Sequence, residues 1–179
     1  MISDVVALPI FDRIFVLLNT MYFMGVHQVN VRAFYKRLDD AGIDERVNRM
    51  LFYCGMCSCV SLPLLGVFDC VKWLPIHYTF ASLFFVSAGT YTFTLAKLMR
   101  DNKERFPIQD EEAIESNYKF GFVMLSLITL LILSTVILGD KYWLTPALEW
   151  TTVFCHMNYF SIMNFTNPFY DSIHPYQGD

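Results

Sequence analysis

The stretch that decides the fold is FGFVMLSLITLLILSTVILG, residues 120–139, which contains no charged residue. An α-helix rises about 1.5 Å per residue, so about 20 apolar residues cross the ~30 Å hydrocarbon core of a bilayer. A soluble protein has little use for an uncharged run of that length. The stretch therefore predicts a transmembrane helix.

The rest of the chain has a similar composition. Its 179 residues are 55% hydrophobic and 17% charged, against roughly 45–50% and 25% in an average soluble domain. Four further windows are apolar enough to cross a bilayer, and the loops between them are too short for a second domain. The predicted spans cover residues 11–31, 50–69, 74–98, 119–139 and 147–168. We expect an all-α integral membrane bundle of five transmembrane helices, with residues 1–179 forming a single domain, and a short surface helix over residues 109–118.

The distribution of Lys and Arg predicts how this bundle lies in the membrane. Ten of these residues fall on one side of the five spans: Arg32, Lys36, Arg37, Arg46, Arg49, Lys97, Arg100, Lys103, Arg105 and Lys119. Only Arg13, Lys72 and Lys141 fall on the other side. Lys and Arg are enriched in loops that face the cytoplasm or matrix. This distribution predicts an N-terminus outside and a C-terminus inside.

Histidines and cysteines within the spans are the candidates for a cofactor site. A haem needs two histidines that face each other at one depth, whereas His27, His77 and His156 are predicted at three different depths. The motif CGMCSC, residues 54–59, has metal-like spacing, but structural zinc needs four ligands and no second pair completes the set. We therefore expect small thiols packed between helices, and neither a metal nor a cofactor.

Several ionisable and aromatic side chains are predicted at the outer boundary. Asp69, His77 and Glu149 could form a shallow pocket for a lipid headgroup or another chain, or could bond to each other where the helices end. In either case we expect His77 to bond Asp69 or Glu149. Other candidates for lipid or partner contacts are Asp12, Arg13, Trp73 and Trp143. No reaction motif accompanies these residues, so we expect a protein that is not an enzyme.

Three long segments resemble the Frag/DRAM/Sfk membrane-protein family, which includes autophagy modulators and proteins that remodel GPI anchors. They are NRMLFYCGMCSCVSLPLLGVFD (48–69), IHYTFASLFFVSAGTYTFTLAKL (76–98) and LEWTTVFCHMNYFSIMNF (148–165). The resemblance covers residues 10–169, and it implies family-type structural residues at Asp69, His77, Glu149 and Trp150. Family members typically have six spans and a long outer loop. The resemblance implies that this chain begins at the family's second span.

Three functions follow from these observations. The shortened bundle and the lack of a reaction motif favour an accessory subunit of a large membrane complex, such as a respiratory-chain assembly of the mitochondrial inner membrane. The resemblance favours instead a lysosomal or other endomembrane protein that acts in lipid-anchor remodelling or autophagy. A haem-binding redox subunit is the third hypothesis. We expect other membrane subunits and phospholipids as partners, and no nucleic acid, because the net charge is −4 and no basic stripe is present.

Overall fold

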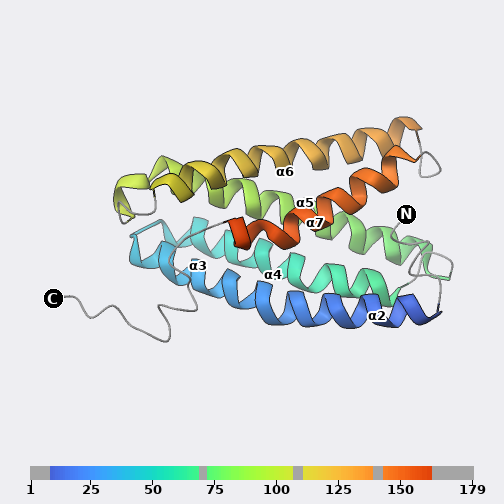
Figure 1. Ribbon diagram of the computed structural model, residues 1–179. Coiled ribbons are helices and arrows are strands. Elements are labelled where there is room, and N and C mark those ends of the chain that lie inside the picture. The colour runs from blue at the N-terminus through green and yellow to red at the C-terminus, as the bar shows by residue number, and fades with distance from the viewer. Residues whose placement is uncertain (1–8, 69–71, 107–110, 139–142, 163–179) are drawn as a thin grey trace.

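The protein is a helical bundle. A computed structural model describes residues 9–68, 72–106, 111–138 and 143–162, which contain helices and turns and no strand. The long helices run roughly along one axis, and the segments between them turn at the two ends of the bundle (Figure 1). The all-α prediction is therefore confirmed for the described residues.

The first predicted span is part of a longer helical rod. Helix α2 (Pro9–Thr20), the π-helix η1 (Met21–His27) and helix α3 (Gln28–Asp40) follow one another directly. The backbone remains right-handed helical at both junctions, at Thr20 and at Gln28. The rod therefore extends well beyond the predicted end at residue 31. A π-helical stretch is rare, and it often marks a functional or specialised part of a helix.

A tight turn connects this rod to helix α4 (Glu45–Val67). Gly42 has a φ of 68°, the left-handed conformation that favours glycine just after a helix. The carboxylate of Asp44 then accepts hydrogen bonds from the backbone N–H groups of Arg46 and Val47, at 3.0 and 3.1 Å. These bonds satisfy two of the donors that a helix start leaves open, so α4 begins at this point.

Helix α6 combines two elements that the sequence analysis separates. Helix α5 (Leu74–Asp101) leads through the short helix η2 (Lys103–Arg105) to α6 (Glu111–Leu138). Instead of a separate surface helix over residues 109–118, α6 begins at Glu111 and continues into the apolar run. No proline or glycine follows until Gly121, so nothing in the sequence ends the helix earlier.

Helix α7 (Leu144–Ile162) completes the bundle. Three of the helices, α4, α5 and α6, are long and apolar enough to cross a membrane. These three correspond to the second, third and fourth predicted spans. The α2–α3 rod and α7 correspond to the first and fifth, which remain predictions as membrane spans, as does the orientation of the chain.

Glycines permit close packing between these helices. A Cβ atom on Gly55 would lie 2.8 Å from Cγ1 of Val31, so this glycine allows α3 and α4 to approach. A Cβ atom on Gly121 would lie 3.1 Å from Cβ of Ala96, where α5 meets α6. Small residues serve this role in membrane bundles, since they allow helix backbones to pack closely.

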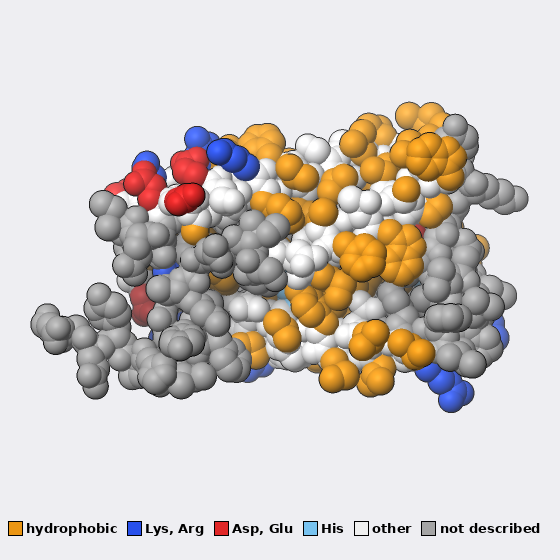
Figure 2. Space-filling view, in the orientation of Figure 1, with side chains coloured by type: hydrophobic (Ala, Val, Ile, Leu, Met, Phe, Trp, Pro, Cys, Tyr) orange, Lys and Arg blue, Asp and Glu red, His pale blue; other side chains and the backbone are white. Residues whose placement is uncertain are grey.

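The surface has the polarity of a membrane bundle. Hydrophobic side chains cover the middle of the face in Figure 2, and acidic and basic side chains gather where α6 begins. Two ion pairs at that end join different elements, Arg100 with Glu115 and Lys103 with Glu111. In contrast, Val136 near the other end of α6 is 79% exposed. A long helix with exposed aliphatic side chains fits a hydrocarbon solvent.

Candidate functional site

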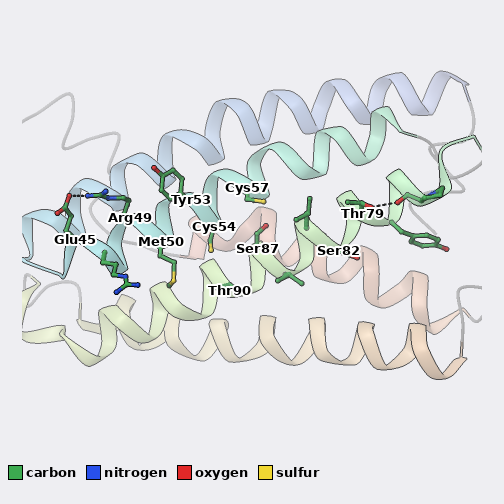
Figure 3. A pocket seen from close by; sticks show the side chains of 15 residues that line it. Glu45, Arg49, Met50, Tyr53, Cys54, Cys57, Thr79, Ser82, Ser87 and Thr90 are labelled. Atoms are coloured by element: carbon green, nitrogen blue, oxygen red, sulfur yellow. Dashed lines mark hydrogen bonds and ion pairs between the residues drawn. The ribbon is translucent and has the colours of Figure 1, made fainter.

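A groove of about 1130 Å³ opens between α4 and α5 (Figure 3). On the α4 side it is lined by a stripe of residues at helical spacing, among them Met50, Tyr53, Cys54 and Cys57. On the α5 side the stripe includes Thr79, Ser82, Leu83, Val86 and Thr90. The lining residues span 45–57 on α4 and 75–90 on α5. His77, at the start of α5, lies beside Phe68, just after α4, so Thr79 and Glu45 lie at opposite ends of the groove. At ~1.5 Å per residue, the groove is therefore about 30 Å long.

Two hydroxyl groups in this groove, those of Thr79 and Ser87, bond to their own helix. The Thr79 hydroxyl donates to the carbonyl oxygen of Pro75 at 2.9 Å. The Ser87 hydroxyl donates to the carbonyl oxygen of Phe84 at 3.2 Å. A polar group at membrane depth is costly unless it is hydrogen-bonded. Because these two side chains satisfy that need locally, they require no polar ligand.

Apolar atoms provide much of the remaining groove surface. The side chains of Met50, Leu83 and Val86 are large, hydrophobic and 44–60% exposed. Two thiols contribute as well, since Cys54 and Cys57 are free cysteines of intermediate exposure. Cys59, in contrast, is buried, so the expectation of thiols packed between helices holds for it and only partly for the other two. The groove therefore presents hydrocarbon and sulfur to the bilayer.

One end of the groove is charged. Arg46 and Arg49 lie there with Glu45, at the first turns of α4. Arg49 and Glu45 form an ion pair four residues apart, drawn as a dashed line in Figure 3. The side chain of Arg46 is exposed and forms no ion pair with any residue in the described ranges. The groove thus changes from charged at this end to apolar along its length.

A second group of polar side chains lies inside the bundle. The rings of His27 from η1 and His156 from α7 have centroids only 4.8 Å apart, and both residues are fully buried. The Nε2 atom of His27 lies 3.3 Å from the hydroxyl oxygen of Ser58 on α4. The Nδ1 atom of His156 lies 3.4 Å from the hydroxyl oxygen of Thr92 on α5. Four segments therefore meet at this histidine pair.

The hydroxyl partners fix the direction of these hydrogen bonds. Ser58 donates its own proton to the carbonyl oxygen of Gly55 at 2.7 Å, and Thr92 donates to Ala88 at 2.7 Å. Each hydroxyl oxygen can then only accept from the facing histidine. Hence His27 carries a proton on Nε2 and His156 on Nδ1. This arrangement needs no charge on either ring, which suits the apolar interior of the bundle.

The expectation that His27 and His156 lie at different depths is wrong. It followed from a first span ending at residue 31, which placed His27 near the end of a helix. Because the rod runs from Pro9 to Asp40, His27 lies near its middle and reaches His156. The π-helical stretch that ends at His27 has no simple signature in the sequence, so its effect could not be anticipated.

This histidine pair does not fit a haem. A haem held by both residues would have its porphyrin plane between the two rings. Ring centroids 4.8 Å apart are in direct contact, which leaves no space for a third ring system. Phe23 and Phe84 also lie against His156, with centroids at 6.0 and 5.6 Å. In addition, no three described His, Cys, Asp or Glu residues are placed to hold a metal ion.

The comparison with family models identifies the protein's relatives. Residues 1–166 match the model of the Frag1/DRAM/Sfk1/Cwh43P N-terminal domain. The chain belongs to this family. No curated protein matches the chain, and no solved structure matches it. The resemblance derived from the three long segments is therefore confirmed by a match across most of the sequence.

Within this Frag1-type domain, His77 is the best-defined of the predicted boundary residues. It is buried at the start of α5, and its Nδ1 atom lies 2.8 Å from the carbonyl oxygen of Phe68, just after α4. Its partner is therefore the backbone beside Asp69, a contact that links the ends of α4 and α5. Asp69 itself lies outside the described residues. Glu149 and Trp150 lie on α7, where Glu149 is buried.

The other predicted contact residues of the Frag1-type domain are placed only in part. Trp73 and Trp143 are 50% and 70% exposed, just before α5 and α7 respectively. Exposed indoles at helix ends suit a membrane boundary. Arg13 is exposed on α2, and the side chain of Asp12 lies outside the described residues. A lipid or partner contact at these residues remains a prediction.

Proposed function

We propose that this chain is an endomembrane protein that binds a membrane lipid in the α4–α5 groove. The protein would act in lipid-anchor remodelling or autophagy by binding a lipid, and it would catalyse no reaction itself. The observation that carries the proposal is the groove, which faces outward from the bundle and is largely apolar. A bilayer fills such a groove with hydrocarbon, and a binding site differs from bulk lipid by its shape and its polar groups.

The family favours the endomembrane alternative over the respiratory-chain subunit. Membership of the Frag1/DRAM/Sfk1/Cwh43P group provides no support for an accessory subunit in the mitochondrial inner membrane. Membership of this family supports the hypothesis of a role in autophagy or lipid-anchor remodelling instead. The haem-binding alternative loses its basis, because the two histidines that meet do not leave room for the group.

The contacts of the groove support binding without catalysis. The hydroxyls of Thr79 and Ser87 each donate to a carbonyl of their own helix. A nucleophilic hydroxyl needs a base beside it that can take its proton. The two intramembrane histidines donate to Ser58 and Thr92 inside the bundle instead of facing this groove.

A matched pair of tryptophan variants tests lipid binding. Val86 lines the groove at 60% exposure, and Val123 on α6 is 50% exposed and lies outside the groove. We expect the indole of V86W to obstruct the middle of the groove and V123W to leave the groove open. Cells fed a fatty acid that carries both a diazirine and an alkyne would then be irradiated, and label on the purified chain would be measured. V86W should lose most of the label that wild type and V123W retain.

Two results would overturn this proposal. Equal labelling of V86W, V123W and wild type would show that the groove holds no particular lipid. Peptide mapping that places the label away from α4 and α5 would lead to the same conclusion. The cellular location requires its own test, by imaging a tagged full-length chain with lysosomal, endoplasmic-reticulum and mitochondrial markers. Overlap with the mitochondrial marker alone would contradict the endomembrane assignment.

A further inference from the structure

We infer that the ligand of the α4–α5 groove is a glycerophospholipid whose phosphate contacts the guanidinium group of Arg46. One acyl chain would follow the groove from there toward Thr79. This inference rests on the proposed function and adds the chemical class of the lipid. It also assigns a binding role to Arg46, which the sequence analysis counts only as one of ten cationic residues on the predicted inner side.

The groove is charged at one end and mainly apolar along the rest of its length. Charged side chains occur at one end of the lining, at Glu45, Arg46 and Arg49. Farther along, the lining consists of Tyr, Met, Cys, Leu, Val and hydroxyl residues. A phospholipid has the same order, with a charged headgroup followed by hydrocarbon. The groove's length of about 30 Å exceeds the ~15 Å depth of one leaflet's hydrocarbon, so an extended acyl chain that starts at Arg46 fits within it.

Arg46 is the cation at this end of the groove that has no ion-pair partner among the described residues. Arg49 already pairs with Glu45. The carboxylate of Asp44 is engaged by backbone N–H groups, one of which belongs to Arg46 itself. The guanidinium of Arg46 is therefore left exposed beside the groove, without an ion-pair partner among the described residues. Arginine can hold a phosphate oxygen pair through two parallel N–H donors.

The charges around Arg46 favour a headgroup with a single phosphate. Asp44 and Glu45 lie next to Arg46 in the sequence, and with Arg49 the four residues carry no net charge. A headgroup with several phosphates would bring surplus negative charge close to these two carboxylates, which is unfavourable. A single phosphodiester requires only one guanidinium. The charged end of the groove therefore suits a phosphatidylcholine-like lipid better than a polyphosphorylated one.

A transmembrane helix of another protein is a less suitable occupant. Its apolar face would have to end at the right depth and present an acidic side chain to Arg46. A phospholipid satisfies both conditions by its covalent structure. The Thr79 and Ser87 hydroxyls, bonded within their own helix, also offer little to the hydrogen-bonding side chains that join membrane helices.

The test compares two lipids that share their acyl chains and differ in the phosphate. The full-length chain in detergent micelles would be incubated with equimolar palmitoyl-oleoyl-phosphatidylcholine and palmitoyl-oleoyl-glycerol, and bound lipid would be counted by native mass spectrometry. Wild type should retain about tenfold more phospholipid than diacylglycerol, as expected for a hydrogen-bonded ion pair. Arg46→Gln should lose most of that preference and still bind diacylglycerol like wild type.

The control is Arg32→Gln, which removes an exposed arginine from α3, outside the groove lining. It should keep the wild-type preference. If wild type binds both lipids equally, or if Arg46→Gln keeps the preference, the inference about phosphate is wrong while the lipid groove stands. If wild type retains neither lipid, the proposed function fails as well. A second chain or another protein retained in place of lipid would overturn both.

Discussion

The histidine pair and the α4–α5 groove place polar groups among apolar side chains in two different ways. His27 and His156 are fully buried, and they share their hydrogen bonds with hydroxyls from two further helices. In the groove, Thr79 and Ser87 bond to their own helix, and neighbours such as Tyr53 are 64% exposed. Polar groups that bond between helices hold the bundle together, whereas polar groups that bond locally leave the surface free for another molecule.

This difference separates stability from binding. Substitutions at the histidine pair disturb contacts among η1, α4, α5 and α7, so they should affect folding. Substitutions in the groove change a surface that no other described helix covers, so they should affect ligands. The two regions share α4 and α5, which makes measurements of stability and lipid retention on the same variants informative.

The largest effect is expected from His156→Ala. This change removes a buried ring that contacts the rings of His27, Phe23 and Phe84. It also removes the histidine nitrogen that faces the Thr92 hydroxyl. Loss of a large buried side chain costs about 3 kcal/mol, which corresponds to a fall in Tm of roughly 6–12 °C for a chain of this size. Thermal unfolding in detergent would measure it.

The matched control for that variant is Phe154→Ala, which truncates an aromatic ring of the same helix that is 53% exposed. Its Tm should remain within a few degrees of wild type, since exposed positions usually contribute less than about 0.5 kcal/mol. Equal losses in the two variants would mean that the histidine pair is not a special point of contact. The buried pair would then contribute no more to stability than an exposed ring of the same helix.

The next effect tests how tightly the helices pack beside the histidine pair. In Gly55→Ala, the new Cβ would lie 2.8 and 2.9 Å from the two γ-carbons of Val31. Overpacking of this kind costs about 1–3 kcal/mol, so Tm should fall.

Gly25→Ala is the matched control for this packing test, because nothing lies within 4 Å of a Cβ at that position. We expect it to leave stability unchanged or to raise it slightly, since alanine restricts the unfolded chain. A lower Tm for Gly25→Ala than for Gly55→Ala would contradict the packing seen around Val31.

A smaller effect is expected for the stability of the groove variant V86W. The side chain of Val86 is largely exposed, so the free energy of unfolding of lipid-free V86W should lie within about 0.5 kcal/mol of wild type. That corresponds to a change in Tm of about 1–2 °C. Addition of phosphatidylcholine should raise the Tm of wild type, because a ligand that binds only the folded state stabilises it. V86W should show little of this rise. A large loss of Tm without lipid would mean that the groove residues serve packing instead.

The sequence predicts the helices of this protein better than its polar contacts. The uncharged run at 120–139 and the four other apolar windows identify five helical segments, because the length of an apolar run is a local property of the sequence. The meeting of His27 with His156 depends on a π-helical stretch and on the packing of four segments, which no local pattern encodes.

The groove lies between these two cases. Its α4 stripe of Met50, Tyr53, Cys54 and Cys57 has helical spacing and leads back to Arg46 and Arg49, so half of it is visible in the sequence. That α5 lies beside this stripe without filling it is a result of tertiary packing.

The smallest effect concerns an ion pair at the charged end of the bundle, outside the groove lining. Lys103 of η2 bonds Glu111 of α6 at 2.6 Å, and this hydrogen bond, with the attraction between the two charges, raises the pKa of Lys103 above its ordinary value near 10.5. A raised lysine pKa means that the pair stabilises the folded state below pH 10.5, and that this contribution is lost as the pH rises through the folded-state value. Lys103→Gln should therefore lower the Tm slightly at pH 7–9, and the gap to wild type should close at strongly alkaline pH. Because both side chains are about half exposed, added salt should reduce this Tm difference as well.

Lys119→Gln is the control, because it removes an exposed lysine that has no ion pair in the described part of the chain. Its Tm should not differ from that of wild type. A gap that widened with pH would mean that Lys103 acts through some contact other than its charge.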